Sequence, residues 1–100
     1  MSSTEPVVLI NSFEVPEGND EEFVAAWQAA REFLETRTGY LGTTLHQTVT
    51  PEAEFRFVNV ARWGTAQDFQ AAVTSDEFRA AAAGLAGYRS HPGLYRVVGA

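Results

Sequence analysis

Three side chains able to form hydrogen bonds stand where the strand pattern calls for apolar residues. Asn11 lies between Leu9 and Phe13 in one β-rich run, and Asn59 and Trp63 lie four residues apart in another. An unpaired buried amide costs about 1–3 kcal/mol, so each Asn needs either a partner in the chain or a ligand. Side chains four apart on a strand share a face and are separated by roughly 13 Å. This spacing predicts a slot that accepts a flat aromatic molecule.

These three residues are the polar points of an otherwise apolar cleft. There is a structural alternative for each residue: Asn11 and Asn59 bond to one another or to a loop backbone, and Trp63 is a core aromatic that ends a strand. The alternative suffices for any one of them. Three such residues facing the same side favour a pocket.

Other kinds of catalytic site are excluded or poorly supported. The chain has no cysteine, which excludes disulfides, thiolate nucleophiles, iron–sulfur clusters and thiolate zinc sites. His46 falls on the opposite strand face from Leu45, and His91 precedes Pro92 and Gly93 in an expected loop. Two isolated histidines without a companion carboxylate at metal-ligand spacing support a metal site only weakly. No strand is followed by a Gly-x-Gly-x-x-Gly motif, so no nucleotide cofactor is expected either.

Composition restricts the partners. The 100 residues carry a formal net charge of -6, which disfavours nucleic acid and anionic membranes. No apolar run approaches the ~18 residues that span a bilayer, and the N-terminus lacks a positive leader region. We therefore expect one cytoplasmic, soluble domain over residues 1–100, with its core at about 7–98, whose partners are small molecules or protein.

The order of predicted elements defines the fold class. A strand at 7–14 ends at a Pro-Glu-Gly turn, and a helix follows from the Asn19 and Glu22 pair toward Gly39. Runs at 41–49 and 55–63 form a hairpin, Thr65 and Ser75 begin two short helices, and 94–98 is the last strand. The order βαββαβ predicts a ferredoxin-like α+β fold with a four-stranded antiparallel sheet.

The sheet is expected to be apolar on both faces. Strand alternation sets Val8 and Ile10, with Val58 and Val60, on the face opposite the two asparagines. The helices can cover only one face, because right-handed crossovers carry them to the same side. A second copy of the chain is the simplest cover for the other face, which predicts a homodimer of the dimeric α/β-barrel type.

Parts of the sequence resemble the antibiotic biosynthesis monooxygenase family over residues 7–98. The resemblance is carried by Asn11-Ser12-Phe13, by Ala66 and Phe69, and by the segments Phe57-Val58-Asn59-Val60-Ala61-Arg62-Trp63 and Ser75-Asp76-Glu77-Phe78-Arg79. It implies a cofactor-free oxygenation of an aromatic polyketide-like phenol or anthrone, with dioxygen as co-substrate and no metal. Asn59, Trp63 and Asn11 would be catalytic, and the substrate would be held by Leu9, Phe13, Phe57 and Phe69.

Two departures from the family pattern leave alternatives open. A Tyr and an Arg used in the polyketide branch appear here as Phe69 and an Ala-rich helix. In the haem-degrading branch Asn11 and Trp63 would match, but the axial His position falls near Ala82, which ranks haem degradation low. The remaining alternatives are a non-catalytic binding or accessory protein and a cyclase or isomerase of the same superfamily. Oxygen uptake with a dihydroxyaromatic substrate discriminates among them.

Overall fold

A computed structural model describes residues 5–100 and arranges them in the predicted order. The elements are β1 (Val7–Glu14), α1 (Asp20–Leu34), β2 (Tyr40–Gln47), β3 (Phe57–Trp63), α2 (Ala66–Val73), α3 (Asp76–Ala81), the short 3-10 helix η1 (Ala83–Leu85) and β4 (Arg89–Tyr95). All neighbouring strands are antiparallel, in the order β2-β3-β1-β4. The ferredoxin-like prediction is confirmed.

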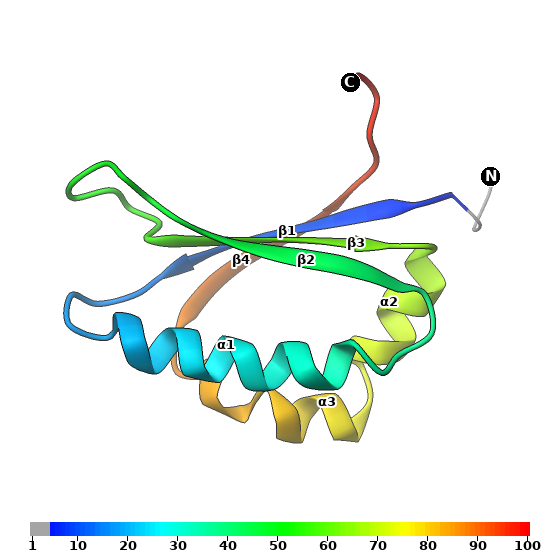
Figure 1. The fold of residues 1–100 in the computed structure, drawn as a ribbon, viewed down its shortest axis with the longest axis horizontal. Coiled ribbons are helices and arrows are strands. Elements are labelled where there is room, and N and C mark those ends of the chain that lie inside the picture. Colours follow the sequence, from blue (N-terminus) through cyan, green and yellow to red (C-terminus); the bar gives the residue numbers. More distant parts are fainter. Residues whose placement is uncertain (1–4) are drawn as a thin grey trace.

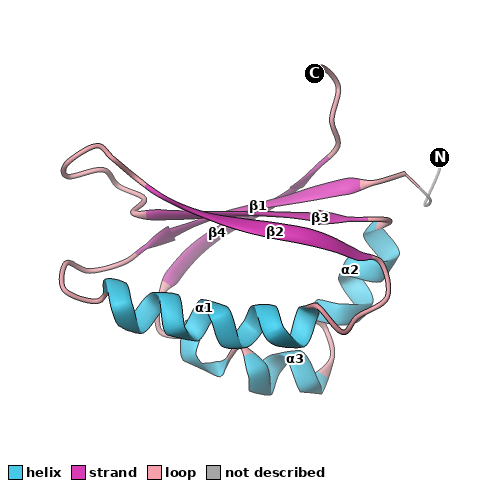
Figure 2. Cartoon of the chain, in the orientation of Figure 1, coloured by secondary structure: helices cyan, strands magenta, loops and turns pink. Residues whose placement is uncertain are grey.

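The helices form a single layer on one face of the sheet (Figure 1 and Figure 2). Two groups of buried side chains fill the space between the layers. In the first, Phe23 of α1 stacks on Phe57 with ring centroids 4.7 Å apart and meets the Phe13 ring edge-on at 4.9 Å. In the second, Trp63 packs with the small residues Ala61 and Ala72. The strand alternation read from the sequence therefore places the helix-facing side chains correctly.

The starts of the two short helices follow the sequence signals, whereas the start of α1 does so only in part. The Thr65 hydroxyl accepts a hydrogen bond from the Asp68 backbone N–H at 3.0 Å, and Ser75 caps α3 in the same way. Asn19 precedes α1, but its side chain does not cap a backbone N–H. Its amide donates instead to the Glu22 carboxylate at 3.1 Å. The predicted pair thus forms through side chains alone.

The position of the last strand corrects the sequence prediction. The strand expected at 94–98 is β4 at Arg89–Tyr95, so His91 and Pro92 lie within a strand and not in a loop. β4 is an edge strand that pairs only with β1, and Asn11 is directly opposite Pro92. Proline is tolerated there because its missing N–H removes no bond to a second neighbour. The strands predicted at 41–49 and 55–63 differ from β2 and β3 by at most two residues at each end.

The second face of the sheet has no helix over it (Figure 1). Val8 and Ile10 of β1, with Val58 and Val60 of β3, are partly exposed there. The chain after β4 leaves the sheet on this side, and Val97 and Val98 remain exposed (Figure 1). None of the described helices is both long enough and apolar enough to cross a membrane.

An ion pair fixes the beginning of α1 over the sheet. The Arg56 guanidinium donates through Nε and Nη2 to the two carboxylate oxygens of Asp20, both at 2.7 Å. Gln47 of β2 adds a donor at 3.3 Å. The hydrogen bond from Arg56 is the main reason why the Asp20 pKa lies below its ordinary value of 3.8. This two-pronged geometry gives the pair directional specificity that a single contact lacks.

Asp20→Asn is expected to destabilise the protein at neutral pH and to matter less in acid. Because the folded-state pKa of Asp20 is depressed, its contribution is present above the unfolded pKa and is lost as the pH falls through the folded value. Urea unfolding of both proteins should therefore show a difference in midpoint at pH 6 that shrinks below about pH 3.9. A difference that stayed constant down to pH 2 would contradict this role.

Candidate active site

A small cavity lies between the helical layer and the sheet. Its volume is about 80 Å³, and its wall is mostly apolar. Its polar members come from four elements: Asn11 of β1, Trp27 and Arg31 of α1, Thr43 of β2 and Asn59 of β3. Both predicted asparagines and Trp63 border this one space. The predicted clustering of these three residues is therefore what the structure shows, while their chemical roles stay predictions.

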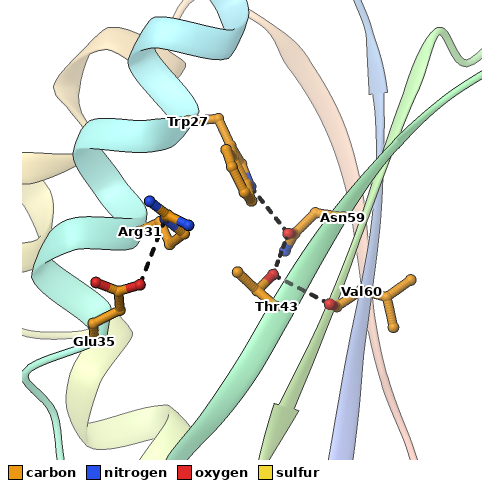
Figure 3. A network of polar contacts seen from close by, with 6 residues as sticks. All are labelled: Trp27, Arg31, Glu35, Thr43, Asn59 and Val60. Carbon is orange, nitrogen blue, oxygen red and sulfur yellow. Dashed lines mark hydrogen bonds and ion pairs between the residues drawn. The ribbon is translucent and has the colours of Figure 1, made fainter.

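The side chain of Asn59 is held in one orientation by two donors (Figure 3). The Trp27 indole Nε1–H donates to Asn59 Oδ1 at 3.0 Å, and the Thr43 hydroxyl donates to the same oxygen at 2.6 Å. The Thr43 oxygen also lies 3.1 Å from the Val60 carbonyl. An indole N–H can only donate, so the atom that faces it must be the amide oxygen. Asn59 Nδ2 consequently keeps its two N–H groups, which have no acceptor among the described residues.

Asn11 lies directly opposite Asn59 in the register of β1 and β3. Its Oδ1 accepts a hydrogen bond from the backbone N–H of His91 on β4 at 3.1 Å. No hydrogen bond joins the two amides within residues 5–100, so they do not satisfy one another. Asn11 is instead satisfied by a backbone, as the structural alternative allowed, although His91 lies in a strand and not in a loop. Each amide uses its oxygen inside the protein, which leaves the nitrogen as the group available to a ligand.

Trp63 forms a rigid end wall of the cavity. Its side chain is completely buried, and its ring meets Tyr40 and Phe69 edge-on with centroids 5.5 and 5.8 Å away. Burial raises the pKa of the Tyr40 phenol, and the Glu35 carboxylate raises it further. Tyr40 is thus a neutral packing partner at pH 7.

The apolar residues predicted to hold a substrate divide into two groups. Leu9, Phe13 and Phe69 border the cavity with the three polar residues. Phe57 does not: it is 2% exposed and stacks on Phe23 in the adjoining aromatic cluster. The difference arises because Phe57 is the first residue of β3, where it packs on Phe23 near the beginning of α1.

Sequence reasoning missed the polar roles of three residues. Trp27, Arg31 and Thr43 are not among the candidate site residues that the sequence predicts. Trp27 and Arg31 are four residues apart, which puts both on one face of α1. An arginine on that otherwise apolar face is the signal that could have identified the pair. Thr43 is two residues from Leu45, so alternation alone places it toward the helices.

The two histidines lie away from the cavity. His46 is exposed on the uncovered face, as predicted, with Nδ1 3.3 Å from the Val58 carbonyl oxygen. His91 of β4 is also exposed, and its Nε2 lies 2.8 Å from a Glu14 carboxylate oxygen. Ala82 directly follows α3 and offers no ligand atom in its side chain. The residues that border the cavity therefore do not fit a haem iron, which needs an axial donor.

The fold agrees with that of known proteins. A family model, antibiotic biosynthesis monooxygenase, matches residues 6–84, and the chain belongs to this family. A structure from Shewanella loihica, described as a candidate monooxygenase, has 36% sequence identity and a TM-score of 0.86, with 99% of this chain and 100% of that chain covered. No curated protein sequence matches.

Two further structures share the fold at lower identity. SnoaB of Streptomyces nogalater, described as a cofactor-independent oxygenase, is 24% identical with a TM-score of 0.84, and 96% of each chain is covered. A Bordetella bronchiseptica structure, described as a candidate antibiotic biosynthesis monooxygenase, is 22% identical with a TM-score of 0.74. The match covers 94% of this chain and 98% of the Bordetella chain.

Thr43→Val is expected to lower the free energy of unfolding by about 0.5–1.5 kcal/mol, because it removes one donor to Asn59 while keeping the β-branched shape. Urea denaturation measures this. Thr38→Val is the matched control, since Thr38 is exposed between α1 and β2 and should change stability by less than about 0.5 kcal/mol. Equal effects of the two substitutions would show that the Thr43 hydroxyl does not hold Asn59.

Proposed function

We propose that the protein is a cofactor-independent monooxygenase that oxidises an electron-rich aromatic phenol or anthrone with dioxygen. The observation that carries the proposal is the oriented amide of Asn59, which presents free N–H donors at an apolar cavity. Membership of the monooxygenase family supports it. The description of SnoaB as a cofactor-independent oxygenase supports the absence of a cofactor, since SnoaB shares the fold.

The reaction balances without an added reductant. An anthrone loses the two hydrogens of its methylene carbon to dioxygen; one oxygen atom becomes the new quinone carbonyl and the other leaves in water. The ionised substrate donates the electrons, so the protein's task is to stabilise that anion and exclude water. Asn59 Nδ2 and the Trp63 indole are the proposed donors to the substrate oxygen. Asn11 would position the substrate or dioxygen from the opposite strand.

The size of the cavity constrains how a substrate enters. At about 80 Å³ it has room for dioxygen or a few water molecules, whereas sites for drug-sized ligands measure roughly 300–1,000 Å³. A three-ring substrate therefore requires side chains around the cavity to move aside. Phe69 and Phe78 on the short helices are partly exposed and are the residues that we expect to swing. Trp63 is fully buried and stays in place.

We also propose that the active form is a homodimer through the uncovered sheet face. The valine and isoleucine side chains on that face form an apolar surface that a second copy would bury. The chain after β4 extends from the same side of the sheet (Figure 1), and Val97 and Val98 in this segment are exposed. A Bacteroides fragilis protein of similar fold, 15% identical, is described as dimeric.

Asn59→Ala is expected to slow enzyme-dependent oxygen uptake with 1,8-dihydroxyanthrone by roughly 100- to 1,000-fold, because it removes a donor to the developing oxyanion. Asn59→Asp is the companion variant, since its carboxylate still accepts from Trp27 and Thr43. It should retain the fold and still lose activity. Trp63→Phe keeps the aromatic surface without the N–H and should lower kcat more than it weakens binding.

An oxygen electrode gives the rates, and thermal unfolding of the same samples gives the stabilities. Loss of melting temperature with unchanged activity per folded molecule would retire the catalytic assignment of Asn59. Binding of the anthrone by the wild-type protein without oxygen uptake would identify a non-catalytic binding or accessory protein instead.

Val58→Asp is expected to dissociate the proposed dimer, because an unpaired carboxylate would be buried in the interface. Val49→Asp is the matched control, because Val49 is 97% exposed in the loop between β2 and β3 and belongs to neither strand. Light scattering should give twice the 10.9 kDa chain mass for the wild type and the control, and the single mass for Val58→Asp. A monomeric wild-type protein at micromolar concentration would refute the dimer.

A further inference from the structure

Arg31 is the one charged side chain among the residues that border the cavity. Its Nε is buried and has no hydrogen-bond partner, and it is the only such side-chain atom among the described residues. The rest of the side chain reaches the surface, so that 38% of it is exposed. A buried donor on a charged group is costly to leave unpaired. The anthrone oxidation proposed for this cavity assigns no role to the Arg31 guanidinium.

The contacts of Arg31 within the protein do not satisfy it. The nearest carboxylate oxygen, on Glu35 one helical turn away, is 3.7 Å from Nε, which is too long for a hydrogen bond (Figure 3). The guanidinium carbon lies 5.6 Å from the centre of the Trp27 ring, within cation–π range. This ring contact positions the group without using its N–H donors.

Trp27 places Arg31 and Asn59 beside one another. The face of its ring carries the Arg31 guanidinium, and its Nε1–H holds the Asn59 oxygen at 3.0 Å (Figure 3). Two sets of free donors, Arg31 Nε and Asn59 Nδ2, therefore flank one indole at one cavity. One of them is positively charged, and none of the carboxylates in residues 5–100 borders the space.

We infer that the cavity selects an aromatic ligand bearing an ionised oxygen, and that Arg31 is the residue that binds this oxygen. The inference rests on the proposed function and deepens it by naming Arg31 as the residue that binds the ionised oxygen of its substrate. Guanidinium groups pair with oxyanions through charge-assisted hydrogen bonds, which are stronger than neutral ones. The carboxylate nearest to Arg31 among the described residues belongs to Glu35, which follows α1 and competes weakly because its side chain is 48% exposed, and the Tyr40 phenol, whose pKa burial raises, is neutral.

Alizarin (1,2-dihydroxyanthraquinone) is the probe, because its visible band moves when it ionises and reports both binding and charge. Unsubstituted 9,10-anthraquinone, which cannot ionise, is the neutral probe. The wild-type protein should bind alizarin in its ionised form at a pH where the free dye is partly neutral. Arg31→Met keeps the apolar stem of the side chain and should weaken alizarin binding at least about tenfold, with anthraquinone affinity unchanged.

Two further variants separate ligand binding from a structural ion pair. Arg31→Lys retains the charge and should restore part of the shift toward ionised dye. Glu35→Gln removes the only nearby carboxylate and should leave alizarin binding equal or tighter. Equal alizarin affinity and equal dye ionisation in wild type and Arg31→Met would overturn the inference, as would a wild-type protein that binds no alizarin.

These experiments test the inference about Arg31 separately from the proposed monooxygenase function. Arg31-dependent dye ionisation without oxygen uptake from the anthrone would keep the ligand class and remove the monooxygenase. Oxygen uptake that is unchanged in Arg31→Met, with no preference for the ionised dye, would keep the monooxygenase and remove the role of Arg31.

Discussion

The amide oxygen of Asn59 joins the two layers of the molecule. It accepts one bond from Trp27 on the helix and one from Thr43 on the neighbouring strand, so α1, β2 and β3 meet at one atom. Without those donors a polar group would face an apolar space at a cost of about 1–3 kcal/mol. With them, the same group becomes a fixed source of N–H donors. Packing and chemistry thus rest on one interaction.

The aromatic clusters on either side give this interaction a dry setting. Phe23 and Phe57 close the space toward the beginning of α1, and the fully buried Trp63 closes the opposite end. Close-packed interiors resist rearrangement, so the donors between the clusters are held in place. Preorganised donors in a medium of low polarity stabilise developing charge more than mobile ones in water. The arrangement suits a reaction that needs an anion to be stabilised and no cofactor.

Two charged residues of α1 have different roles: Asp20 stabilises the fold, and Arg31 is the proposed ligand-binding residue. At its start, Asp20 is paired at short distance with Arg56 and serves the fold. Further along, Arg31 is only loosely associated with Glu35, and its buried Nε has no hydrogen-bond partner among the described residues. On a chain with a net charge of -6, a single cation at an apolar cavity provides a local site of opposite sign. The positive charge of Arg31 stands out against the negative charge of the chain, and the Trp27 ring positions it.

Local patterns in the sequence determined the βαββαβ order, the face on which each strand residue lies and the caps at Thr65 and Ser75, because these depend on neighbours within a few positions. They also brought Asn11, Asn59 and Trp63 to one face, since alternation has a strict period of two. Only the tertiary structure decided what these residues touch. Trp27 and Asn59 are 32 residues apart, and no local pattern encodes which donor meets which acceptor. The same holds for β4: Pro92 reads as a loop residue until its strand is known to lie at the edge, where a missing N–H leaves no neighbour unpaired.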